Sequence, residues 1–342
     1  MRRTGRAVLA CATAIVLAAC GGSAPSTPTP PATPSATGVS VSADPFAGET
    51  AWIAYQTDRG GEGTWLIHPD GTHDHEIAAG SAADLILPNW SPDGRRLVLT
   101  SRNTGGTEPL YEFDLQTEKL RRLFACRAPC LGDDEPVYSP DGRKVAFIRA
   151  LGPIENDLPS DCGFWIGDLS TGKVEQVTSN ASCDREYFLR WSPDGAKLTY
   201  WRWREEPVGN TTGTAVFVMA ADGTGERQLT DWSMFAGDAD WSPDGKWIVF
   251  STHPLPAFNF ELVVSDLYRM HPDGSGLEQL TQYESADLRA TQPRYSPDGD
   301  WIVFTTVTPS SRSLSVIPAE GGEPIVIAEG EIYTHGTWQP GR

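Results

Sequence analysis

The sequence contains little that predicts helices. No stretch places apolar residues at the i, i+3, i+4 and i+7 positions of a helical face, and 34 glycines and 27 prolines favour turns. Hydrophobic residues still make up 39% of the 342 residues, with 12 tryptophans and 12 phenylalanines, so a large core can be buried. The length suits two ordinary domains or one large all-β domain, and the composition argues against long helices.

Basic residues are also scarce. The 27 lysines and arginines face 45 aspartates and glutamates, which gives a formal net charge of −18 at pH 7. A surface this acidic repels phosphate backbones, so nucleic acid is not expected as a partner.

Motifs of catalysis and of metal binding are missing as well. No serine lies in a Gly-x-Ser-x-Gly elbow, the six histidines suggest no triad, and no EF-hand spacing occurs. His73 and His75 would share one face of a strand, so a metal-binding pair is feasible, but zinc would need further ligands. We expect no enzyme and no cofactor.

The N-terminus has the three parts of a secretion signal. Arg2, Arg3 and Arg6 precede an apolar run from Ala7 to Ala19, which is too short to span a bilayer. The run ends in Leu17-Ala18-Ala19-Cys20, which resembles the lipobox of bacterial lipoproteins; the alternative is an ordinary signal with an incidental cysteine.

The resemblance implies that residues 1–19 are removed and that Cys20 carries a lipid anchor on the extracytoplasmic side of the membrane. Residues 20–48 are rich in Pro, Ser and Thr and should form an extended tether, since they cannot bury enough apolar surface to fold.

Four cysteines remain in the mature chain, in a compartment where disulfides form. Three connectivities are possible. Cys162 is expected to open a strand whose hairpin partner ends just before Cys183, so a Cys162–Cys183 bond is geometrically natural. Cys126–Cys130 is then left by elimination. A metal site built from the four is the alternative, although Cys126-x-x-x-Cys130 lacks the usual Cys-x-x-Cys knuckle.

One motif, an aromatic residue followed by Ser-Pro-Asp-Gly, occurs five times. Its proline presets φ, its aspartate bonds nearby backbone N–H groups and its glycine supplies positive φ, so each copy predicts a turn. The aspartates should be turn formers spread around a ring, not ligands of one ion. The copies begin at Trp90, Tyr138, Trp191, Trp241 and Tyr295.

The spacing of these copies, 48 to 54 residues, is typical of a β-propeller with four strands per blade. Residues 51–55 have the pattern of a second strand, but no copy of the motif precedes them. Residues 336–341 are a degenerate copy of the motif, and no second strand follows them. Pairing of the C-terminal strand into the first blade would close a six-bladed ring over residues 49–342 and remove exposed sheet edges.

Aromatic-Ser-Pro-Asp-Gly followed by an apolar strand, an aromatic strand, Asp-Gly and x-Leu-Thr resembles the propeller of the TolB type, over residues 50–342. TolB carries an additional N-terminal α/β domain where this sequence has only the tether. The resemblance thus implies the propeller more than the Tol-complex role. Propellers also cover prolyl oligopeptidases, but those require a hydrolase domain that is missing here.

The residue before each motif aromatic should line the central channel. Polar side chains there could bind a carboxylate, a peptide terminus or a sugar; the alternative is an Arg–Asp network filled with ordered water. The candidates are Asn89, Arg190, Asp240, Arg294 and Thr337, with Val137 as the apolar member.

The variable loops should gather on the face opposite the motif turns, and residues 125–137 and 149–163 are expected to be its longest and most irregular loops. Acidic residues there could hold Ca²⁺ or form a solvated rim. They are Asp133, Asp134, Glu135, Asp157, Asp161, Asp184 and Glu186.

Together these features favour a monomeric, lipid-anchored propeller of the cell envelope. We expect its variable face to bind an envelope protein or peptide without catalysis. The alternatives are an envelope hydrolase or lyase with a metal in the channel, and a sensor for a small ligand or glycan.

Overall fold

The computed structural model describes residues 51–57, 59, 62–77, 84–102, 108–155, 158–179, 186–205, 211–252, 265–283, 288–330 and 332–341. Residue contacts group positions 44–342 into one unit. The predicted signal peptide 1–19, the lipidated Cys20 and the tether to residue 48 lie outside the described residues. Within the described ranges, no helix is long and apolar enough to cross a bilayer.

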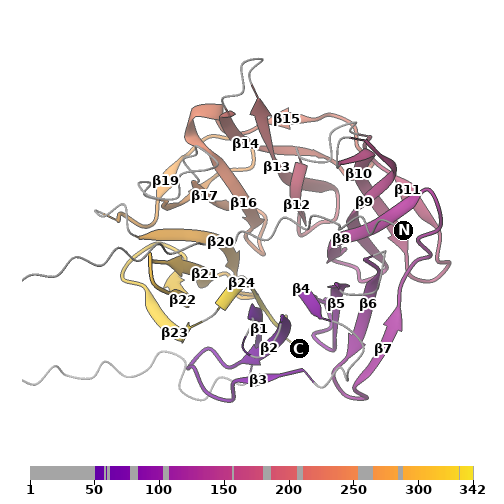
Figure 1. Ribbon diagram of the computed structural model, residues 1–342. Coiled ribbons are helices and arrows are strands. Elements are labelled where there is room, and N and C mark those ends of the chain that lie inside the picture. Colours follow the sequence, from indigo (N-terminus) through magenta and orange to yellow (C-terminus); the bar gives the residue numbers. More distant parts are fainter. Residues whose placement is uncertain are drawn as a thin grey trace, which may run out of the picture. The chain divides into compact units, whose positions relative to one another are not determined.

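Six four-stranded antiparallel sheets make up this unit, and we call them blades 1 to 6 in chain order. Each innermost strand lies against the next around a common axis (Figure 1). The predicted six-bladed propeller is thereby confirmed. A short 3₁₀ turn, η2 (Trp232–Met234), precedes the fifth blade.

The innermost strands of blades 1 to 6 are β24 (Ile332–Trp338), β4 (Leu85–Trp90), β8 (Cys130–Tyr138), β12 (Glu186–Trp191), β16 (Ala236–Trp241) and β20 (Arg289–Tyr295). The second strands are β1 (Ile53–Thr57), β5 (Arg96–Ser101), β9 (Lys144–Glu155), β13 (Lys197–Glu205), β17 (Ile248–Thr252) and β21 (Trp301–Val307).

The third strands are β2 (Gly63–Ile67), β6 (Leu110–Asp114), β10 (Leu158–Asp168), β14 (Thr211–Ala220), β18 (Leu267–Met270) and β22 (Arg312–Pro318). The outermost strands are β3 (His75–Glu76), β7 (Lys119–Arg122), β11 (Val174–Gln176), β15 (Arg227–Gln228), β19 (Glu278–Gln279) and β23 (Ile325–Gly330).

The ring closes where the C-terminal strand β24 pairs with β1, with Trp338 opposite Ile53. Gln339 reinforces this closure. Its backbone N–H donates to Trp52 O at 2.7 Å, and its side-chain Nε2 donates to Gly94 O of blade 2 at 2.6 Å. Closure therefore joins the last residues of the chain to the first two blades.

The repeated motif forms the turn between the innermost and second strand of a blade. In blade 2, Asp93 Oδ1 accepts hydrogen bonds from Ser91 Oγ at 2.6 Å and from Arg95 N at 3.1 Å, and Gly94 has a φ of 65°. The same two acceptor roles recur at the other four copies, where they belong to Asp141, Asp194, Asp244 and Asp298.

The hydrophobic core lies between neighbouring blades. Ala54 and Leu66 of blade 1, for example, pack in one buried cluster with Leu97 and Leu99 of blade 2. Since the second strands are covered on both sides, their central residues are mostly apolar; β1 is buried along its whole length.

Two segments expected to be irregular loops are largely strand, so that prediction was wrong. Within residues 149–163, β9 and β10 continue as a hairpin in which Arg149 pairs with Gly163. Within residues 125–137, β8 begins at Cys130. Polar residues fit these strands because Arg149 and Asp133 satisfy each other. Cys162 accordingly lies inside β10 and does not open it.

Candidate functional site

A β-bulge interrupts each innermost strand three residues before the motif aromatic. The bulged residue has positive φ in all six strands, a conformation that costs a non-glycine residue about 1–2 kcal/mol. These six residues are Leu87, Glu135, Phe188, Asp238, Gln292 and His335.

The bulge gives the axis two rings of side chains: the positive-φ residues, and the predicted channel residues two positions later. Most members of both rings keep part of their surface accessible, while the residues beside them on the same strands are mostly buried between blades. Because each innermost strand runs toward its motif turn, the positive-φ ring lies nearer the opposite, variable face. The sequence predicts the second ring but not the first.

Several ring members bind the next blade. Asp240 Oδ2 accepts the N–H of Tyr295 at 2.9 Å. Glu135 and Gln292 accept the N–H groups of the bulged residues that follow them around the ring, Phe188 and His335. A bulge leaves a backbone N–H out of the ladder, and these side chains satisfy it. Such contacts hold adjacent blades together.

The charged members of the second ring come from consecutive blades, and we call Arg190, Asp240 and Arg294 the axial cluster. Arg190 Nε lies 4.0 Å from Asp240 Oδ1, beyond hydrogen-bond distance. Arg294 Nη1 donates to the carbonyl oxygens of Asp238 at 3.1 Å and Pro293 at 2.6 Å. Among the described residues, Arg190 Nε and Arg294 Nη2 are buried N–H groups without an acceptor.

The pKa shifts along the axis all disfavour charge. Burial lowers the pKa of Arg190 to about 9, and the positive charge of Arg294 adds to the shift. Burial also lowers the pKa of Arg294 and raises that of Asp240. It raises the pKa of Glu135 to about 8 and lowers that of His335 to about 3. The charges are thus close together with too few polar partners to solvate them.

Of the five predicted channel residues, the structure brings Arg190, Asp240 and Arg294 together. Asn89 and Thr337 belong to blades 2 and 1, in the half of the ring without charged members of the second ring. Asn89 Oδ1 accepts the N–H of Tyr138 at 3.4 Å, and Thr337 O accepts Trp90 Nε1 at 3.0 Å. Both therefore serve contacts between blades.

The positive-φ ring could not be found from residue type, because its members are aliphatic, aromatic, acidic, amide and imidazole side chains. Only their constant position, three residues before the motif aromatic, relates them. That signal can be used only once a bulge is expected there.

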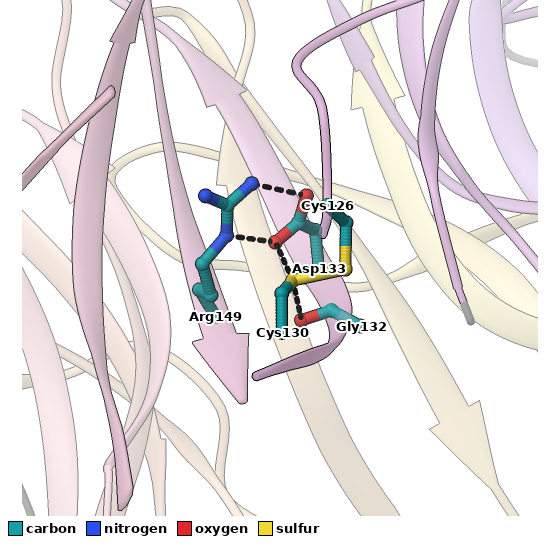
Figure 2. The surroundings of a disulfide bond; sticks show 5 residues. All are labelled: Cys126, Cys130, Gly132, Asp133 and Arg149. Carbon is teal, nitrogen blue, oxygen red and sulfur yellow. Dashed lines mark hydrogen bonds and ion pairs between the residues drawn. A yellow bond between two sulfur atoms is a disulfide. The ribbon is translucent and has the colours of Figure 1, made fainter. Parts of the chain in front are cut away.

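Another buried arginine, Arg149, lies at the variable-face end of blade 3 (Figure 2). Arg149 donates from Nε and Nη2 to the two carboxylate oxygens of Asp133, at 2.6 and 2.9 Å. Beside this pair, Cys126 and Cys130 form a disulfide with a Cα–Cα distance of 5.3 Å. Cys162 is also disulfide-bonded, and its predicted partner Cys183 lies outside the described residues.

The acidic residues considered as calcium ligands have separate partners. Asp134 Oδ1 accepts from Thr100 Oγ1 at 2.9 Å, and Asp161 Oδ1 accepts from Ser179 Oγ at 3.1 Å. Asp157 and Asp184 lie outside the described residues. In the described part of the chain, the one compact group of metal-ligating atoms is Cys126, Cys130 and Asp133, whose sulfurs form the disulfide.

Comparison with known proteins gives distant relatives. The chain matches no known protein-family profile. An uncharacterized protein of Agrobacterium fabrum is 29% identical over 229 residues, which cover 64% of this chain and 64% of that protein. The Tol-Pal system protein TolB of Francisella tularensis is 27% identical over 111 residues, which cover 32% of this chain and 23% of that protein. Each match spans less than two thirds of the relative.

Solved structures share the fold. TolB from Acinetobacter baumannii superposes with a TM-score of 0.63 at 19% identity, over 85% of this chain and 66% of that one. An oligogalacturonate lyase in complex with manganese superposes with a TM-score of 0.56 at 17% identity, over 81% of this chain and 73% of that one. From its repeat, its closure and these likenesses, the chain is a TolB-like six-bladed β-propeller.

Proposed function

We propose that the chain is a non-catalytic, lipid-anchored binding module of the bacterial cell envelope, and that its axis receives a carboxylate from a protein or peptide partner. The observation that carries this proposal is the pair of buried guanidinium N–H groups, on Arg190 and Arg294, that lack an acceptor. Buried charged donors are normally satisfied, and a carboxylate is the group that guanidinium binds best.

The order of the two rings supports entry from the variable face. A partner coming from that side reaches the positive-φ ring first, where Phe188 and His335 stack with their ring centroids 5.2 Å apart. Arg190 and Arg294 lie behind this stack, so a partner has to displace it to reach them. An aromatic pair followed by cationic donors suits a peptide segment that ends in, or carries, a carboxylate.

The cell-envelope location rests on the N-terminal sequence, where Cys20 ends a lipobox-like tetrapeptide. The name of the TolB relative, a Tol-Pal system protein, supports a role within a system of several proteins. The alternative of a metal-dependent lyase draws on the manganese-bound neighbour, which shares the fold at 17% identity.

Site-specific photocrosslinking in intact cells tests the proposal. A photoreactive phenylalanine analogue at position 188 should capture a partner, and a second change, Arg294→Met, should reduce capture by at least about 30-fold, because a buried charged contact contributes 2 kcal/mol or more. The same analogue at the exposed Leu277, beside the outermost strand β19, is the matched control.

Capture that is equal at positions 188 and 277, or that survives Arg294→Met, would contradict the proposal. Once a partner peptide is known, its amidated and free-acid forms separate a terminal carboxylate from an acidic side chain. Stoichiometric manganese in the purified protein would favour the hypothesis of a metal-dependent lyase instead.

A further inference from the structure

Blade 1 concentrates histidine in one hairpin. Three of the six histidines lie between residues 68 and 75, where β2 turns into β3. All three rings contact the indole of Trp52, with centroid distances of 4.0 Å for His68, 6.4 Å for His73 and 5.1 Å for His75. His68 and His73 are themselves 4.5 Å apart. The hairpin thus gathers three imidazoles around one aromatic side chain.

Hydrogen bonds determine which ring nitrogen of His73 and of His75 carries a proton. His75 Nδ1 lies 2.6 Å from His73 O, which can only accept, so Nδ1 carries the proton. His73 Nδ1 lies 2.8 Å from Thr72 Oγ1, and this hydroxyl already donates to Asp70 Oδ1 at 2.6 Å. It therefore accepts from His73. In the neutral form of either imidazole the nitrogen left for a metal is then Nε2, the arrangement common among metal-ligating histidines.

The backbone at His73 is strained. Its φ is 61°, and the equivalent turn positions of blades 4 and 5 are Gly225 and Gly276, each with a φ of 66°. Glycine adopts this conformation freely, whereas histidine loses about 1–2 kcal/mol. His73 is exposed, so no packing in the core requires its side chain there. A strained residue that packing does not explain points to a function.

Blade 5 shows what the hairpin looks like without these additions. His271 begins the same His-Pro-Asp-Gly turn and stacks on Trp247 at 4.2 Å, as His68 packs on Trp52. The positions of His73 and His75 are occupied there by Gly276 and Glu278. The first histidine is therefore shared with blade 5, while the other two have no counterpart there.

We propose that His68, His73 and His75 bind a divalent transition-metal ion at the rim of a pocket between blades 1 and 2. The pocket has a volume of about 630 Å³, and Trp52, His75 and Glu76 belong to its lining. As placed, the rings pack around Trp52 and their ligand nitrogens do not converge on one point, so binding requires the exposed side chains of His73 and His75 to turn. Imidazole donors select Cu²⁺, Ni²⁺ or Zn²⁺ over Mg²⁺ and Ca²⁺.

The test uses the full chain, prepared without a histidine tag and titrated by calorimetry with Cu²⁺, Ni²⁺, Zn²⁺ and Ca²⁺. We expect one equivalent of a transition metal to bind, with Cu²⁺ the tightest and no heat from Ca²⁺. His73→Gly and His75→Glu, which install the residues of blade 5, should each weaken binding at least about tenfold. His271→Ala, the matched control, should bind like the parent.

The thermal unfolding midpoints of the metal-free variants show whether weakened metal binding results from unfolding. His73→Gly removes backbone strain and should not lower the midpoint. Parent-like affinity in His73→Gly and His75→Glu overturns the proposal, as does an equal loss in His271→Ala or the absence of saturable binding. None of these outcomes bears on the axial cluster, because the hairpin lies at the outer part of blade 1.

Discussion

Two buried arginine sites in this propeller differ in how completely they are satisfied. The Arg149 side chain is 6% exposed, binds both carboxylate oxygens of Asp133, and lies 5.2 Å from the ring centroids of Phe147 and Trp165. Arg294 is 3% exposed and donates only to backbone carbonyls, and its buried Nη2 has no acceptor. Burial is equal at the two sites, and each guanidinium donates two hydrogen bonds; the acceptors are carboxylate oxygens for Arg149 and backbone carbonyls for Arg294.

The difference separates a structural role from a binding role. A buried ion pair in which both carboxylate oxygens accept from the guanidinium is explained by the fold that contains it. A buried guanidinium with unmet donors is a cost to that fold, and its neighbours show this cost as pKa shifts toward the neutral forms. Exposure alone would have placed both arginines in the same class.

The largest expected effect is at the satisfied site. Asp133→Ala leaves the Arg149 guanidinium buried without its partner, which should reduce the free energy of unfolding by about 3–5 kcal/mol. Urea denaturation of the purified protein measures this loss. Asp161→Ala is the matched control, since this partly exposed acid on β10 makes one hydrogen bond, to Ser179, and should cost less than about 1 kcal/mol. Similar losses in both variants would place Arg149 with the unsatisfied arginines.

A smaller, pH-dependent effect is expected at Glu135, on the axis. Its pKa is about 8 in the folded protein because of burial, against about 4.5 when unfolded. Between these pH values the folded state holds a proton that the unfolded state has released, so stability falls as pH rises from about 4.5 to 8. Below this window the two states bind the proton alike.

Glu135→Gln removes this loss and keeps an oxygen for the N–H of Phe188, as Gln292 does for His335. The variant should match the parent near pH 5 and exceed it near pH 9 by on the order of 2–4 kcal/mol. Denaturation at both pH values checks the difference, and other titrating groups cancel between the two proteins. A variant whose advantage is equal at pH 5 and pH 9 shows that Glu135 is ionised in the fold.

The sequence predicted the ring because its turns are local: Ser91, Asp93 and Gly94 specify their own geometry, and apolar second strands follow from burial on both sides. It predicted irregular loops where β8, β9 and β10 continue. Their polar residues, such as Asp133 and Arg149, suggest exposure until the pairing across two strands is known.

The axial site was only partly predictable for the same reason. The position just before each motif aromatic predicted that Arg190, Asp240 and Arg294 line the channel. It could not show that Asp240 also holds the N–H of Tyr295, while the arginines keep free donors. Which side chains are satisfied is decided by contacts between blades, and those contacts join residues about 50 positions apart in the chain.

The smallest expected effect concerns Arg294 itself. Arg294→Met removes one of two like charges whose proximity lowers the pKa of Arg190, and it leaves Asp240 with Arg190 and the Tyr295 N–H as partners. The free energy of unfolding should therefore change by less than about 1 kcal/mol, and a gain is as consistent with the comparison as no change, because an apolar side chain can replace an unsatisfied buried charge without loss. Arg149→Met, measured beside it, leaves Asp133 without its cation and should cost several times more. If the two substitutions destabilise the protein equally, then Arg294 is as fully satisfied as Arg149 and its free N–H group has no ligand to receive.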